Sequence, residues 1–163
     1  MRFFFDMQLE SLLKVRMGKA ECEAIAAYTL ERDDVFVKLL DFVEHGDNTQ
    51  AMKAAWVIGH VRKMNQAQSM KHQDRILKLL QQATIGGVQR ELLKAMERLL
   101  LKEANDAALL DYAWNGLSNM KYDIAVRYSC LRIIRFYSKR FPEFREELKS
   151  IESVQLEKTG RFP

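Results

Sequence analysis

Four side chains near the C-terminal end of the chain have types and spacing suited to binding an acidic group. They are Tyr128, Arg132, Arg135 and Lys139. Intervals of four, three and four residues place them on one face of an α-helix. Arginine and lysine bind carboxylates and phosphates, and an aromatic ring among them adds apolar contact area. This face is therefore a candidate binding surface.

The apolar residues opposite this face form a pattern that two earlier segments of the chain repeat. Alignment of the three segments predicts which side chains of the earlier two lie on the corresponding helix face. The eight further positions are Lys53, Val57, His60, Met64, Arg90, Lys94, Glu97 and Leu101. Six of the twelve positions are basic and only Glu97 is acidic. A surface of one sign attracts an oppositely charged partner. The predicted partner-binding residues are Lys53, His60, Arg90, Lys94, Tyr128, Arg132, Arg135 and Lys139.

A simpler interpretation of the same charges stays open. Any helix face in water needs polar side chains, and the long stems of lysine and arginine also cover apolar surface. The charges would then keep the helices solvated without binding a partner.

Residues Trp56–His60 form the stretch that most resembles a reactive site, because histidine transfers protons near neutral pH. The register gives Trp56 the place of two leucines in the later segments, which predicts packing. His60 falls on the polar side, and the other two histidines show no ligand spacing with it. We therefore expect no catalytic residue, no metal site and no bound cofactor.

The sequence motifs of the common enzyme classes are absent from the chain. It has no nucleophile elbow, no P-loop, no dinucleotide-binding glycine motif, no H-E-x-x-H and no C-x-x-C. The sequence thus predicts a protein that is not an enzyme and has no evident small-molecule substrate.

The elements that position these side chains are predicted to be helices. Only two prolines and seven glycines occur in 163 residues, of which 48% are hydrophobic, so signals for strands and tight turns are scarce. Cys22 and Cys130 lie within apolar helical patterns without metal-ligand spacing, and we expect both to be free thiols.

The N-terminal run Met1–Phe5 resembles the start of a signal peptide, but Asp6 ends it too early. No later stretch approaches the roughly eighteen apolar residues of a membrane span. We expect a cytoplasmic protein without a membrane partner.

Apolar residues at three- and four-residue spacing predict nine helices, joined by short breaks that favour antiparallel packing. Gly46 is expected to end one helix and the following Asp47 and Asn48 to supply the cap of the next, while Gly86 and Gly87 separate two others. The predicted helices span about 6–16, 19–31, 34–44, 48–65, 69–83, 87–102, 106–119, 123–140 and 142–156.

A pair of helices recurs about every 37 residues. Ala51, Ala55 and Ile58 align with similar residues 37 positions later, and those align with a third set after a further 38. Repeats of this length built from two helices are typical of α-solenoids. We predict one all-α domain over residues 1–163, of about four pairs and eight or nine antiparallel helices. Its parts are a degenerate pair at about 6–31, repeats at about 33–66, 69–103 and 106–140, and a capping helix at about 142–156.

Residues 123–134, DIAVRYSCLRII, resemble the second helix of a HEAT repeat. That pattern is an aspartate, a Val-Arg pair and then small and aliphatic residues, represented here by Asp123, Val126, Arg127, Cys130 and Ile133. The two earlier copies match it more loosely, and the resemblance covers about residues 33–140. A HEAT-like (armadillo-type) repeat implies a curved α-α superhelix whose second helices line a concave, partner-binding side.

The resemblance and the basic residues together predict a non-catalytic protein-binding or scaffold module for a protein with an acidic surface. The alternative is binding of a nucleic-acid backbone, with or without base excision as in the HEAT-like DNA glycosylases. Asp111, Tyr112 and Trp114 are the nearest counterpart of an excision site, but they match no motif.

Overall fold

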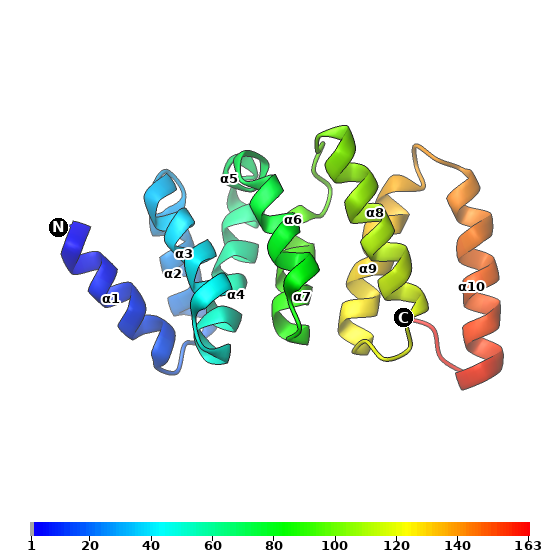
Figure 1. Ribbon diagram of the computed structural model, residues 1–163, viewed down its shortest axis with the longest axis horizontal. Coiled ribbons are helices and arrows are strands. Elements are labelled where there is room, and N and C mark those ends of the chain that lie inside the picture. Colours follow the sequence, from blue (N-terminus) through cyan, green and yellow to red (C-terminus); the bar gives the residue numbers. More distant parts are fainter. Residues whose placement is uncertain (1) are drawn as a thin grey trace. The chain divides into compact units, whose positions relative to one another are not determined.

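A computed structural model describes residues 2–163, with side chains from residue 8 onward. Residue 1 and the side chains of the apolar run Met1–Phe5 lie outside this part. The described residues form ten helices and no strand (Figure 1). None of these helices is long and apolar enough to cross a lipid bilayer. The predicted all-α class built from successive helical pairs is confirmed.

The first compact unit of the chain, Met1–Met96, contains seven helices. Helix α4 lies at its centre and packs against α2, α3 and α7. Its small residues Ala51, Ala55 and Gly59 are buried, and their size lets neighbouring helices approach closely. The seven helices are α1 (Arg2–Lys14), α2 (Lys19–Thr29), α3 (Asp33–His45), α4 (Asn48–Met64), α5 (Ala67–Lys71), α6 (Gln73–Gln82) and α7 (Gly86–Met96).

The second compact unit, Glu97–Pro163, contains α8 (Glu103–Ser118), α9 (Ile124–Tyr137) and α10 (Glu143–Thr159). Helices α8 and α9 form an antiparallel pair, and α10 lies beside α9 (Figure 1). Within the pair, Gly116 of α8 lies directly against Cys130 of α9, where an added Cβ would be 2.7 Å from the Cys130 Sγ. The single domain expected over residues 1–163 stays a prediction.

The turn between α3 and α4 follows the capping signal in the sequence. Gly46 ends α3, and Asp47 is the N-cap of α4. The Gln50 backbone N–H donates to the Asp47 carboxylate at 2.9 Å, while the Asp47 backbone N–H donates to the Gln50 side chain at 3.1 Å. This reciprocal pair satisfies two donors that the first turn of a helix leaves free.

The single helix expected at 69–83 is wrong, because the chain forms α5 and α6 with a break at His72. The His72 ring lies 2.6 Å from a carboxylate oxygen of Asp33 and stacks on Phe36 at a centroid distance of 5.3 Å. Both partners belong to α3. These contacts fix His72 outside regular helical geometry, with φ −104° and ψ 20°.

The helix expected at 87–102 is too long, since α7 begins at Gly86 and ends at Met96. Arg98 adopts a left-handed backbone conformation with φ 58°, which a continuous right-handed helix cannot include. Residues 97–102 therefore lead into α8 as a connecting segment. Leu99 and Leu101 of this segment are buried, so apolar burial rather than helix formation explains its hydrophobic character.

Helix α10 is attached to the α8–α9 pair by a buried polar contact. Gln155, the buried residue of α10, donates from its amide to the Leu117 carbonyl at 2.8 Å. Its amide oxygen accepts a hydrogen bond from the buried Arg127 guanidinium, which also donates to the Leu117 carbonyl. Burial lowers the pKa of Arg127. One glutamine thus joins three helices.

Candidate functional site

The predicted partner-binding residues fall into two groups, one in each compact unit. Tyr128, Arg132 and Arg135 lie on α9, and Lys139 follows its C-terminal end. The other four lie in the first unit, with Lys53 and His60 on α4 and Arg90 and Lys94 on α7.

The α9 group lines a single open cavity of about 440 Å³, which we call the basic groove. The side of α9 opposite these residues is apolar and packed, because Val126, Cys130, Ile133 and Tyr137 are all buried. Packing of that side against α8 forces the basic side of α9 outward. The groove is lined by Glu97, Arg98, Tyr128, Arg132, Arg135, Phe136 and Lys139.

Glu97 is the acidic member of the groove, and it is buried rather than displayed on the surface. Arg132 holds it with two donors, Nε at 2.9 Å and Nη2 at 2.8 Å from the same carboxylate oxygen. The Arg98 guanidinium lies 3.8 Å from that oxygen. This pairing fixes the Arg132 side chain in place, because a charge-assisted contact with two donors has a defined geometry.

Arg135 and Lys139 differ from Arg132 in having no ion-pair partner in the part of the chain that the structure describes. Both side chains are exposed, and neither has an acidic partner among the described residues. They are therefore the groove cations that an incoming anion reaches without breaking an existing ion pair.

Sequence reasoning missed Arg98 and Phe136 as members of this groove. Arg98 enters it because the left-handed turn after α7 redirects the chain. No glycine or asparagine marks that turn in the sequence. Phe136 directly follows Arg135 on α9 and is half-buried at the groove edge. It lies four residues after Arg132, and this spacing makes the two side chains neighbours on the helix surface.

In the first unit, the carboxylate of Glu91 forms ion pairs with both predicted basic residues of α7, Arg90 and Lys94. One of its oxygens lies 3.3 Å from the Arg90 Nε and 3.1 Å from the Lys94 Nζ. Its other oxygen faces Gly59 of α4, where an added Cβ would be 2.8 Å away. Gly59 thus makes room for a buried carboxylate between α4 and α7.

On α4, the predicted partner-binding residues also contact the protein itself. The Lys53 ammonium donates to the Val15 carbonyl just beyond α1. His60 is half-buried, with its ring edge-on to Trp56 at 5.9 Å. Burial, followed by the charge of Lys63, lowers the pKa of His60. This position favours the neutral imidazole.

Two apolar positions of the predicted surface are wrong, because Val57 and Leu101 are buried. Val57 lies on α4, which is covered by α2, α3 and α7, so little of its circumference is left for solvent. Leu101 lies in the connecting segment after α7, where the helical register no longer applies.

The residues considered for base excision are spread around α8. Asp111 is exposed, whereas Tyr112 is half-buried and burial raises the pKa of its hydroxyl. The Trp114 ring packs edge-on against Phe144 of α10 at 5.5 Å, so it takes part in helix packing. In the described residues, no three His, Cys, Asp or Glu side chains are grouped to hold a metal ion.

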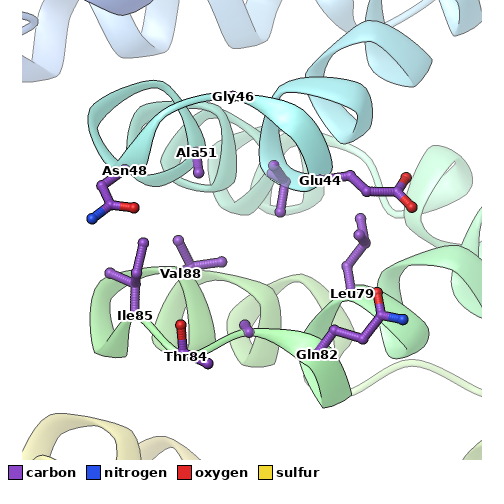
Figure 2. Close-up of a pocket in the computed structure, with 11 residues that line it drawn as sticks. Glu44, Gly46, Asn48, Ala51, Leu79, Gln82, Thr84, Ile85 and Val88 are labelled. Carbon is purple, nitrogen blue, oxygen red and sulfur yellow. The ribbon is translucent and has the colours of Figure 1, made fainter.

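A separate cavity of about 200 Å³ lies in the first unit, between the α3–α4 turn and the segment joining α6 to α7 (Figure 2). Asn48 and Thr84 lie at its rim, and Ala51 and Val88 form part of its wall. Glu44 also lines it, but its carboxylate is paired with Arg75 at 2.8 Å. Its volume is below the roughly 300 Å³ at which small-molecule sites begin.

Comparison with protein families matches residues 9–159 of the chain to the HEAT repeat domain. Comparisons with curated proteins and with solved structures gave no match. The family match covers most of both compact units and includes every helix from α2 to α10 in full.

Proposed function

We propose that this chain, which belongs to the HEAT repeat domain family, is a non-catalytic module that binds an acidic protein segment in the basic groove. The family indicates a helical repeat scaffold for protein interaction. The observation that carries the finer proposal is the groove itself, which gathers four cations around one buried carboxylate. Its cations are Arg98, Arg132, Arg135 and Lys139.

The cations of the groove have two roles. Some form ion pairs within the protein, and the others are available to a partner. Arg132 is fixed by Glu97, so it offers its remaining donors in a preset direction. Arg135 and Lys139 lack acidic partners among the described side chains and supply the attraction. A fixed arginine beside free cations suits a partner with several carboxylates, because pre-ordered donors lose less conformational entropy on binding.

A protein segment fits this groove better than a nucleic-acid duplex does. A protein that binds a duplex through its backbone can contact about 6 to 10 phosphates, each met by a lysine or arginine. The groove holds four cations, and two of them lie near Glu97.

The test is affinity capture from cytoplasmic lysate of the source cells, with Arg135→Glu and Lys139→Glu combined in one variant. We expect specific proteins to be retained by the wild type and lost from the variant. The matched control is Arg145→Glu with Arg161→Glu, which makes the same change of charge at exposed sites outside the groove. Retention of the same proteins by the groove variant would overturn the proposal.

Nuclease treatment of the lysate separates the protein partner from the nucleic-acid alternative. Capture that persists after treatment supports a protein partner. Capture that disappears, together with a mobility shift of bare duplex or single-stranded oligonucleotide at low salt, would assign the groove to nucleic acid instead.

A further inference from the structure

The exposed face of α9 extends beyond the basic groove toward the N-terminal end of the helix. Ile124 lies four residues before Tyr128 and therefore on the same face. The two are unusually exposed for their types, Ile124 at 54% and Tyr128 at 46%. Burying such apolar surface against a partner is favourable, since it removes the surface from water.

The face therefore has two chemically different ends. Ile124 and Tyr128 make its first half apolar, whereas Arg132, Arg135 and Lys139 make its second half cationic. The charged residues next to Ile124, Lys121 and Asp123, are exposed and of opposite sign, so they give the apolar end no net charge. An acidic partner is attracted to one end only.

The separation of the two ends sets the length of a matching ligand. Ile124 and Arg135 are eleven residues apart, which is about 16 Å along an α-helix. An extended peptide rises about 3.3 Å per residue, so about five residues span that distance.

We propose that the occupant of the groove is an extended peptide segment with a hydrophobic side chain about five residues from a cluster of acidic residues. The hydrophobic side chain packs on Ile124 and Tyr128, and the carboxylates meet Arg135 and Lys139. The inference rests on the proposed function and adds the order and spacing of the partner's residues. Of the two anchor residues only Tyr128 has a flat ring on which a base can stack, and the aliphatic Ile124 adds contact area for a hydrophobic side chain of a protein.

The test uses three fluorescently labelled peptides and measures their binding to the full chain by anisotropy. The first has one leucine, a four-residue Gly/Ser spacer and three glutamates. The second replaces the leucine with serine, and the third shortens the spacer to one residue. We expect the first to bind about five- to tenfold more tightly than the other two, as partial burial of one aliphatic side chain on an open surface implies.

Variants of the protein assign the effect to α9. Ile124→Ser should bring the first peptide to the affinity of the second and leave the second unchanged. Leu156→Ser is the matched control, since Leu156 is exposed at 45% on α10 and does not line the groove. Arg135→Glu with Lys139→Glu should abolish binding of all three peptides.

The outcomes separate this inference from the proposed function. Equal binding of the three peptides, with no effect of Ile124→Ser, would overturn the anchor and its spacing while leaving an acidic partner supported. Binding of none of the peptides would overturn both. A preference for an oligonucleotide over every peptide would likewise overturn both and assign the groove to nucleic acid.

Discussion

Arg98 combines a costly backbone conformation with a charged side chain in the basic groove. A non-glycine residue in the left-handed region costs about 1 kcal/mol or more, because its Cβ approaches the neighbouring carbonyl. Arg98 has φ 58° and lines the groove beside Arg132. Strained backbone of this kind tends to occur at functional sites, in keeping with the role proposed for the groove.

We expect Arg98→Gly to raise the free energy of unfolding by up to about 1 kcal/mol, because glycine adopts this conformation without a Cβ clash. The lost ion pair with Glu97 is long, at 3.8 Å, and exposed on the arginine side, so its loss offsets little of the gain. Urea denaturation measures the change. Arg98→Ala keeps the strained backbone and should show no such gain; an equal gain there would contradict the explanation.

Asp33 links α3 to the break between α5 and α6. Its carboxylate lies 2.8 Å from the Lys71 Nζ and 2.6 Å from the His72 ring. Hydrogen bonds from Lys71 and then His72 lower the pKa of Asp33 below its ordinary value of 3.8. The folded protein therefore favours the ionised carboxylate.

The sign of the resulting pH dependence follows from proton binding. Near pH 3.8 the unfolded chain takes up the proton of Asp33 more readily than the folded one, so this contribution to stability is complete above that pH. It is lost as pH falls through the lowered folded-state pKa. Asp33→Asn should be less stable than the wild type at pH 7, and the difference should shrink below about pH 4. Urea unfolding at a series of pH values tests this, and a difference independent of pH would contradict it.

At the scale of elements, the α8–α9 pair depends on one close contact. An added Cβ at Gly116 would lie 2.7 Å from the Cys130 Sγ and 3.8 Å from its Cβ. The first distance is a clash and the second an ordinary contact. The sulfur atom alone therefore requires glycine at this place.

We expect Gly116→Ala to lower the free energy of unfolding by about 1 to 2 kcal/mol, since overpacking outweighs the better helix propensity of alanine. Adding Cys130→Ala should restore much of the loss, because it removes the clashing sulfur. A double-mutant cycle by urea denaturation should give a favourable coupling of at least about 1 kcal/mol. Additive effects of the two changes would show that another contact requires the glycine.

Much of the helical architecture could be predicted from the sequence, because local patterns determine it. Apolar spacing located the helices, and Gly46 followed by Asp47 and Asn48 marked the boundary between α3 and α4. The break at His72 and the end of α7 at Met96 depend on contacts with α3 and on the turn at Arg98. Those are tertiary effects that local propensity does not report.

The candidate site was predictable in part for the same reason. The basic face of α9 followed from its register, whereas Val57 was misplaced because α4 is covered on three sides. Arg98 could not be predicted, since it reaches the groove through a turn that no sequence signal marks.

At the scale of the whole molecule, the two compact units have the same net charge, and the uneven distribution of charge lies within each unit. Residues 1–96 hold 14 basic and 12 acidic side chains, and residues 97–163 hold 12 and 10. Each unit thus has the same small positive charge. The basic groove arises in the second unit because α10 alone carries five of its acidic residues, away from the exposed face of α9.

The two cysteines are natural probes for the unfolding of each unit, because a buried thiol reacts only when it becomes exposed. Cys22 lies in the first unit and Cys130 in the second, and both thiols are free and buried. Burial raises the pKa of each to about 12, so almost no reactive thiolate exists at neutral pH in the folded protein.

Brief pulses of an alkylating reagent at increasing urea concentration should therefore modify each cysteine only when its own unit opens. Mass spectrometry of the digested protein reads the two sites separately. Coincident midpoints would show that the two units unfold cooperatively, and distinct midpoints would rank their stabilities. Rapid alkylation of either cysteine without urea would contradict the burial described here. The native chain thus needs no added label to report how independent its two halves are.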